Sequence, residues 1–381
     1  MIPTCTESSH GRSGDYNGVM ARSMVLVGGA FVALVAGCGA RTGLQAWSDT
    51  GVAAEAGAAG DAGLAADAAL DDGQSCADAG CIAQRPTGVV LLGRTGLSAP
   101  DFLPSTWAWD GTSWTEQDVV SPQPARDNAS MSRLNDSSVL FGGRAAPPAN
   151  GLLADTWVWS GGWAQQSASG PSPRERAAMA TLGYTVVLFG GRDAHGVEGD
   201  TWTWNGASWT RIDTPGPSAR CAHAMATLRG TVVLFGGKNG DVQSPGGPLF
   251  GDTWTWNGKS WTQLDVAGPG ARVSPAMATL GDTVVLLGGM DESGSVLGDT
   301  WTWDGAAWTP VDVQGPTTVK GVPAIPNLVA TLEGTVVLYS APQSLGPSYT
   351  WTWKGTSWKR LDVIGPNLLE GPFQAAVMST W

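Results

Sequence analysis

A tryptophan motif that returns six times is the feature that most constrains how this chain can fold. Each copy contains the tetrapeptide Thr-Trp-x-Trp, a short glycine-containing turn and a third tryptophan, and successive copies lie 50, 45, 52, 47 and 50 residues apart. The Trp-x-Trp pairs are Trp107/Trp109, Trp157/Trp159, Trp202/Trp204, Trp254/Trp256, Trp301/Trp303 and Trp351/Trp353. The third tryptophans are Trp114, Trp163, Trp209, Trp261, Trp308 and Trp358. A period of about 50 residues with short β-type segments between glycine turns predicts a β-propeller whose blades are four-stranded antiparallel sheets.

The fourth copy indicates how one blade is built. Two short apolar segments joined by a turn precede residues 253–256, which alternate threonine and tryptophan and so place both tryptophans on one face of a strand. Asn257-Gly258 is typical of a two-residue hairpin turn. Counting back from that turn predicts that Trp254 lies opposite Trp261, so that each blade carries a cross-strand aromatic pair against its neighbour.

The two ends of the repeat region predict how many blades there are and how the ring closes. The first copy begins directly at the apolar run 88–93 without a preceding first strand, whereas the last residues, 378–381, match the first strands of other copies. A C-terminal strand that completes the first blade would leave no exposed sheet edge. We therefore expect an all-β domain over residues 86–381, a six-bladed propeller closed by its C-terminal strand.

Composition narrows the classes of partner. The 381 residues include 54 glycines and 24 prolines, and only 14% are charged. This composition disfavours a helical bundle. The net charge of −12 argues against a nucleic-acid partner, because phosphate binding needs a basic patch. We expect a monomer that does not bind nucleic acid.

The N-terminal segment has the features of an export signal. Residues 24–37 form an uncharged apolar run after Arg22, too short for the roughly 20 residues of a membrane-spanning helix but suited to a signal peptide. The run ends in Leu-Val-Ala-Gly before Cys38, which resembles a bacterial lipobox. That resemblance implies a signal peptide over 1–37, with Met20 as an alternative start, and a lipidated Cys38. It also implies a lipid anchor at the cell envelope, and because Gly39 is not an aspartate we expect the outer membrane or cell surface rather than the inner membrane.

Residues 38–85 are rich in alanine, glycine and aspartate and have few large apolar side chains, so we expect a disordered, flexible linker before the propeller. Cys76 and Cys81 lie within it. In an exported chain this close pair favours a disulfide over a metal site, and no histidine accompanies it.

The repeats also resemble a known family. The apolar run followed by a double glycine, as at Gly142-Gly143 and Gly236-Gly237, and the later aromatic pair resemble the kelch repeat, with tryptophan where kelch usually has tyrosine. The resemblance implies a kelch-type propeller similar to the central domain of galactose oxidase. It covers residues 86–381, with departures in the first and last copies, which lack the double glycine.

The resemblance also raises the question of catalysis. Galactose oxidase uses two tyrosines, two histidines and a cysteine at copper, and the candidate groups here are His195, His223, Tyr184, Tyr339, Tyr349 and Cys221. We expect no cofactor or metal, since His223 fits a packing role and Cys221 a small buried one. Kelch-type sugar epimerases and mutarotases use an acid–base pair in the central channel. The alternative is therefore a carbohydrate-active enzyme with Glu175, Glu198 or Glu292 as base.

The connections of variable length all fall at one face of the predicted propeller, where binding residues of a rigid scaffold usually lie. An arginine recurs there five residues before the first-strand methionine of four copies. These arginines, joined by Arg176, are Arg126, Arg174, Arg220 and Arg272. Such an arc suits a carboxylate or anionic sugar; the alternative is a structural role, in pairs with Asp200, Asp252 or Asp299. The resulting prediction is a non-catalytic module that binds an unknown protein or glycan on this face.

Overall fold

The structure is a computed structural model that describes residues 88–95, 103–147, 149–242, 246–313, 315–317, 328–340, 348–363, 365–366 and 376–381. The predicted signal peptide, Cys38, the linker and the Cys76/Cys81 pair lie outside these residues and stay predictions. Every regular element in the described residues is a β-strand. No helix among them is long and apolar enough to cross a membrane.

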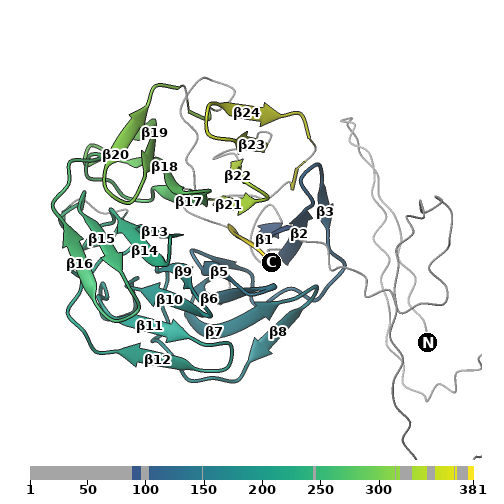
Figure 1. Ribbon diagram of the computed structural model, residues 1–381. Helices are drawn as coiled ribbons and strands as arrows, with labels where there is room; N and C mark the ends of the chain where they lie inside the picture. Colours follow the sequence, from purple (N-terminus) through teal and green to yellow (C-terminus); the bar gives the residue numbers. More distant parts are fainter. Residues whose placement is uncertain are drawn as a thin grey trace, which may run out of the picture. The chain divides into compact units, whose positions relative to one another are not determined.

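The strands form six sheets arranged around a central axis (Figure 1). The first sheet contains β25 (Ala376–Thr380), β1 (Val89–Thr95), β2 (Leu103–Trp109) and β3 (Trp114–Glu116). The second contains β4 (Arg126–Asp127), β5 (Ser130–Leu134), β6 (Ser137–Ala145), β7 (Leu152–Trp159) and β8 (Trp163–Gln166). The third contains β9 (Ala178–Leu182), β10 (Thr185–Phe189), β11 (Thr201–Trp204) and β12 (Trp209–Ile212).

The other three blades repeat the four-stranded plan. The fourth contains β13 (Ala224–Leu228), β14 (Thr231–Phe235), β15 (Thr253–Trp256) and β16 (Trp261–Leu264). The fifth contains β17 (Ala276–Leu280), β18 (Thr283–Met290), β19 (Val296–Trp303) and β20 (Trp308–Val311). The sixth contains β21 (Leu328–Leu332), β22 (Thr335–Ser340), β23 (Tyr349–Trp353) and β24 (Trp358–Leu361). All pairs are antiparallel, and only the second blade departs from four strands, through the two-residue β4.

The C-terminal strand closes the ring, as the sequence predicts. β25 pairs with β1 in a register that runs from Val89 opposite Thr380 to Gly93 opposite Ala376. The innermost strands β25, β5, β9, β13, β17 and β21 contact one another in succession around the axis. The predicted six-bladed propeller with C-terminal closure is therefore confirmed.

The predicted hairpin turn, however, is wrong. Trp256 and not Trp254 lies opposite Trp261, and residues 257–260 form a four-residue turn between them. The reason is a side-chain cap: Oδ1 of Asn257 accepts hydrogen bonds from the backbone N–H groups of Lys259 at 2.9 Å and Ser260 at 3.0 Å. Asparagine favours such local turns because its side chain substitutes for a backbone acceptor.

The core of the domain lies between the blades. Trp256 is fully buried, and its ring lies 5.3 Å from that of Trp261 at 41°. Phe189 of the third blade meets the edge of Trp261 at 5.2 Å, so the two blades interlock through aromatic rings. Corresponding tilted tryptophan pairs occur in all six blades.

One hydrogen bond is repeated at every boundary between blades. The indole Nε1 of the third tryptophan donates to the hydroxyl of the motif threonine in the preceding blade. The pairs are Trp163–Thr106 at 2.9 Å, Trp209–Thr156 at 2.8 Å, Trp261–Thr201 at 2.9 Å, Trp308–Thr253 at 2.9 Å, Trp358–Thr300 at 3.0 Å and Trp114–Thr350 at 2.9 Å. The last pair joins the first blade to the sixth, so the bond continues around the whole ring.

The connection between blades must pass directly over this tryptophan. A Cβ on Gly216 would lie 2.8 Å from Cδ1 of Trp261, closer than real contacts allow. Gly170 and Gly268 occupy the same place against Trp209 and Trp308. Glycine at these positions lets the chain cross the ring and seal the outer edge of the core.

We expect the two tryptophans of one motif to differ in their effect on stability. Replacement of Trp256 by alanine should lower the free energy of unfolding by about 3–5 kcal/mol, because the lost ring is fully buried between blades. Trp254→Ala should cost only about 1–2 kcal/mol, because Trp254 is partly exposed and loses a single hydrogen bond to Asp252. Denaturant unfolding of both variants tests this, and equal losses would contradict the observed register.

Candidate binding face

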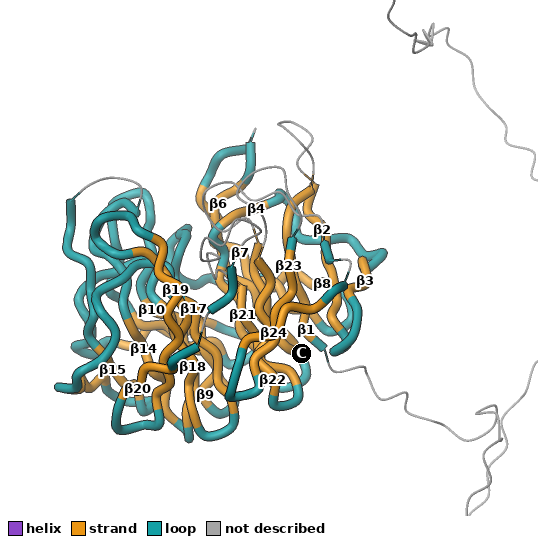
Figure 2. The backbone as a smooth tube through the Cα atoms, turned by 90° about the horizontal axis from the view of Figure 1, so that it is seen from above, coloured by secondary structure: helices purple, strands orange, loops and turns teal. Residues whose placement is uncertain are grey.

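The two ends of the propeller differ in the length of their connections. One end, the turn face, carries only the short turns between the first and second and the third and fourth strands of each blade. The other end, the loop face, carries the longer second-to-third connections and the crossings to the next blade, as Figure 2 shows in a view across the blades. This separation agrees with the sequence prediction.

Arg220 shows what the recurrent arginine does. Its guanidinium Nη1 and Nη2 donate to the two carboxylate oxygens of Asp252 at 2.6 and 2.9 Å, and Nη1 also donates to the carbonyl of Gly236 at 3.0 Å. Asp252 in turn accepts a hydrogen bond from Nε1 of Trp254 at 2.7 Å. The arginine side chain is fully buried, so this is a bidentate, desolvated pair rather than a surface one.

The same Arg–Asp–Trp unit occurs in four consecutive blades. The units are Arg126–Asp155–Trp157, Arg174–Asp200–Trp202, Arg220–Asp252–Trp254 and Arg272–Asp299–Trp301. The arginine backbone faces the preceding blade, where, for example, the Arg220 carbonyl accepts from Gly191 N–H at 3.0 Å. Arg174, Arg220 and Arg272 therefore each tie two adjacent blades together.

The first and sixth blades lack the unit. Ser105 and Tyr349 stand where the other blades have the aspartate, and at the arginine position the sequence has Phe373 and Ala324, both outside the described residues. In the sixth blade the indole Nε1 of Trp351 has no hydrogen-bond partner among the described residues. Arginine and aspartate are thus present together or absent together, as expected of residues that serve each other.

The arginines lower the pKa of the aspartate in three of these units. Burial alone would raise the pKa of the Asp252 carboxyl, but the hydrogen bonds and charge of Arg220 hold that pKa below its ordinary value. Arg174 and Arg272 have the same effect on the pKa of Asp200 and Asp299. Removing one member would leave a charge in a partly buried place without its partner.

These contacts show what surrounds the four arginines that the sequence predicts to form an arc. The side chains of Arg126, Arg174, Arg220 and Arg272 are at most 3% exposed, and their guanidinium groups are engaged within the protein. The geometry matches the structural alternative that the sequence left open. A role in ligand binding for these four arginines stays a prediction.

A second group of charges lies at the loop face, and of its members the sequence analysis named only Arg176, as part of the arc, and Glu175, as a candidate base. This mouth cluster consists of Arg144, Glu175, Arg176, Arg192 and Asp241. Arg144 donates to Glu175 at 2.7 and 3.1 Å, and Arg192 pairs with Asp241 at 3.1 Å across the third and fourth blades. Burial would raise the pKa of Glu175, but Arg144 and Arg176 hold it below its ordinary value. Arg144 and Arg192 stay 43% and 35% exposed, so they can reach a ligand.

Arg176 lies at a position whose left-handed backbone conformation recurs in neighbouring blades. Arg176 has φ of 58°, and Asn128, Ala222 and Ser274 take the same left-handed conformation at the corresponding positions. Backbone hydrogen bonds join these residues in succession: Ser274 N–H donates to the Ala222 carbonyl, Ala222 N–H to the Arg176 carbonyl and Arg176 N–H to the Asn128 carbonyl. The Gly-Gly-Arg repeats at Arg144 and Arg192 were the sequence signal for this cluster.

The structure does not gather the groups considered for catalysis. His195 is exposed in a loop-face connection, whereas Tyr184 is 83% exposed in the β9–β10 turn on the opposite face. Tyr339 is buried, and its hydroxyl donates to the Pro366 carbonyl at 2.5 Å. The guanidinium of Arg360 lies over the ring of Tyr349, 5.2 Å from its centre. Among the described residues, no group of three or more histidine, cysteine, aspartate or glutamate side chains is placed to hold a metal ion.

The buried candidates have pKa values far from neutrality. Burial, with the nearby charge of Arg220, lowers the pKa of His223 to about 3, and burial raises the pKa of the Cys221 thiol to about 11. His223 packs edge to face on Phe189 at 5.5 Å, which agrees with its predicted packing role. Burial and the charges of Asp193 and Asp200 raise the pKa of Glu198, whereas Glu292 is exposed in its loop.

The central channel is lined mainly by small and apolar side chains. A cavity of about 260 Å³ is bounded by the six innermost strands, and five of them contribute a methionine to its lining: Met131, Met179, Met225, Met277 and Met378. Threonine hydroxyls link the strands. Thr331 donates to the Thr279 carbonyl, Thr279 to Thr227, Thr227 to Thr181 and Thr181 to Arg133. These hydrogen bonds join five of the innermost strands in succession, from β21 to β5.

The closed ring with its longer connections at one end is a β-propeller. Residues 106–289, from β2 to β18, match the family model described as the KLHDC2/KLHL20/DRC7 Kelch-repeats domain. Together with the six-bladed fold, this match shows that the protein is a kelch-repeat β-propeller. No curated protein sequence matches the chain.

We expect the buried arginine units to control stability. Arg220→Ala should lower the free energy of unfolding by about 2–4 kcal/mol, because it leaves Asp252 without its partner in a site that is only 22% exposed. Denaturant unfolding measures the loss. Arg229→Ala is the matched control, since its pair with Asp282 is exposed at 57% and 83% and should contribute under about 1 kcal/mol. Equal effects of the two substitutions would refute the structural role of Arg220.

Proposed function

We propose that this protein binds a protein partner on its loop face and carries out no reaction there. The kelch-repeat β-propeller fold suggests a protein-binding module. The observation that supports the loop face is the gathering of its longer connections at one end of a ring tied by tryptophan contacts and Arg–Asp–Trp units. Such a scaffold holds its loops in place, so little conformational entropy is lost when a partner binds.

The mouth cluster supplies the polar contacts for such a partner. Arg144 and Arg192 are each paired on one side and open to solvent on the other, at 43% and 35% exposure. Their partners Glu175 and Asp241 hold the guanidinium groups in defined positions. Partly exposed, positioned arginines are favoured at protein interfaces because they combine apolar stems with several hydrogen-bond donors.

A carbohydrate-active enzyme finds less support in the described residues. Glu175 is engaged by two arginines, and the pKa values of His223 and Cys221 are unsuited to proton transfer near neutral pH. The observation in favour of that class is the raised pKa of Glu198 on the third blade, which is hydrogen-bonded to Asp193, a carboxyl whose pKa is lowered.

Site-specific photo-crosslinking tests the loop face. A photoreactive amino acid at His195 or Glu292, both exposed on this face, should give the same discrete protein adduct in the native cells. The same probe at Tyr184, which is 83% exposed on the turn face, is the control and should not give that adduct. Arg144→Ala should weaken the adduct formed from His195. Equal adducts from both faces would refute the proposal, and adducts with glycan alone would replace the protein partner by a glycan.

We also propose that the module is anchored at the cell envelope by a lipid on Cys38, a residue outside the described part of the chain. Stable anchoring needs more than one acyl chain, which a fully modified N-terminal cysteine supplies. A labelled fatty acid should mark the wild-type protein and bring it to the membrane fraction, whereas Cys38→Ser should stay unlabelled. Equal labelling of the two would refute the anchor.

A further inference from the structure

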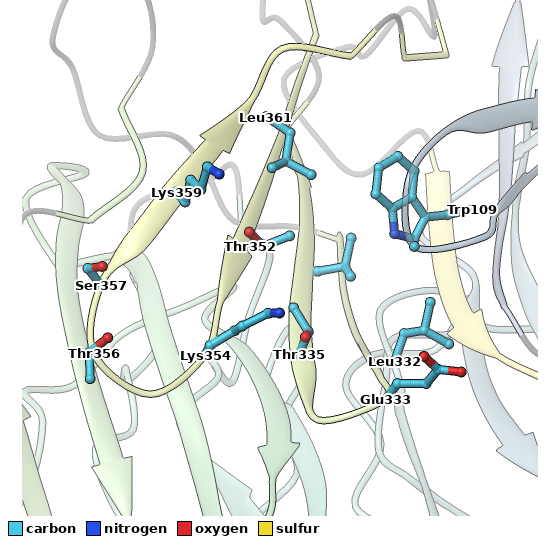
Figure 3. Close-up of a pocket in the computed structure, with 12 residues that line it drawn as sticks. Trp109, Leu332, Glu333, Thr335, Thr352, Lys354, Thr356, Ser357, Lys359 and Leu361 are labelled. Carbon is cyan, nitrogen blue, oxygen red and sulfur yellow. The ribbon is translucent and has the colours of Figure 1, made fainter.

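A pocket opens at the boundary between the sixth and first blades, on the side of the turn face. Its volume is about 550 Å³, within the range of small-molecule sites. Figure 3 shows Lys354, Lys359 and Thr352 on one wall, with Trp109, Leu332 and Glu333 across from them. We call it the seam pocket, because the ring closes at this boundary.

Two lysines distinguish the sixth blade from every other blade. Lys354 begins the turn after Trp353, and Lys359 lies opposite Thr352 on the face that looks toward the first blade. The residues that correspond to Lys354 are Asp110, Ser160, Asn205, Asn257 and Asp304. Those that correspond to Lys359 are Thr115, Ala164, Thr210, Thr262 and Thr309. The five other blades thus carry no cation at either position.

The lysine at position 354 gives up a local stabilising contact. In four other blades the side-chain oxygen at this position accepts hydrogen bonds from two N–H groups of its turn, as Asp304 does from Ala306 and Ala307 at 2.8 Å. A lysine side chain has donors and no acceptor, so it cannot make this cap. A residue that departs from a local rule kept elsewhere in the chain is expected where function requires it.

Both ammonium groups are free to meet a ligand. Within the described part of the chain, neither Lys354 nor Lys359 forms an ion pair within 4.0 Å, although Glu333 also lines the pocket. The two positive charges therefore face a concave site in a protein whose net charge is −12. Opposite charge in a cleft attracts a small anion more strongly than an open surface does.

The other lining groups suit a polyhydroxylated molecule. Thr335, Thr352, Thr356 and Ser357 contribute hydroxyls that donate and accept, and Glu333 contributes an acceptor on the opposite wall. Leu332 and Leu361 add apolar surface that can cover one face of a sugar ring. The seam is also the boundary where both adjoining blades lack the Arg–Asp–Trp unit.

We propose that the seam pocket binds an acidic monosaccharide, a sugar that carries a carboxylate or a phosphate. The anionic group is held by Lys354 and Lys359, and the sugar hydroxyls by the threonines and Glu333. This site is on the opposite side from the loop face, so it is independent of the protein partner proposed there.

Calorimetric titration of the full-length protein tests the ligand class. The probes are glucuronate, glucose 6-phosphate, glucose and inorganic phosphate. We expect saturable binding of at least one acidic sugar, with glucose and inorganic phosphate at least about tenfold weaker, and weaker binding at higher salt because the lysines are exposed. Saturation by glucuronate alone assigns the carboxylate form and by glucose 6-phosphate alone the phosphate form. No saturable binding of either, or inorganic phosphate binding as tightly as both, would overturn the proposal.

The repeats themselves supply the test variants. Lys354→Asn and Lys359→Thr restore the residues of the fourth blade, so the fold should be kept, and Lys354→Asn should melt at the same or a higher temperature. Each substitution should weaken binding of the acidic sugar by about tenfold. Lys259→Thr, which removes an exposed lysine from the corresponding turn of the fourth blade, should leave binding unchanged. Undiminished binding by the double variant, or an equal loss in Lys259→Thr, would overturn the site.

Discussion

The contact between the tryptophans of one blade and the sheet of the preceding blade is the interaction on which the rest of the structure depends. The tryptophans of each motif form a flat aromatic surface that a single blade cannot bury. Trp256 and Trp261 become buried only because Phe189 and Thr201 of the preceding blade lie against them. The contact is repeated at every boundary, including the one between the sixth and first blades, where β25 completes the first sheet and leaves no edge of it open at the axis.

The Arg–Asp–Trp units extend this contact to the loop face. Arg220 links the connection before the fourth blade to Gly191 of the third and to Asp252 of its own blade. The left-handed residues next to these arginines, such as Arg176, bind one another through the backbone. These backbone contacts fix the base of the loop face. The residue after the double glycine varies above it: Arg144 and Arg192 in the second and third blades, Lys238 in the fourth and Met290 in the fifth.

The boundary between the sixth and first blades differs for a reason that the repeats make visible. The tryptophan contact is kept, through Trp114 and Thr350, but neither adjoining blade has the arginine and aspartate found in the other four. Position 354 has also exchanged a turn-capping side chain for a lysine. The seam pocket lies at this boundary, and its two lysines form no ion pair with any residue that the structure describes.

Sequence alone determined the blade number, the order of strands and the closure, because one motif repeated at a nearly constant interval leaves few ways to bury its tryptophans. It also placed the variable loops on one face, since antiparallel connectivity decides on which side each connection emerges. It failed at the turn after Trp256, where a side-chain cap selects four residues over two. Only the tertiary structure decided that Arg220 pairs with Asp252 inside the protein and that Lys354, Glu333 and Trp109 line one pocket, because these residues lie far apart in the chain and are brought together by the pairing of strands and the packing of neighbouring blades.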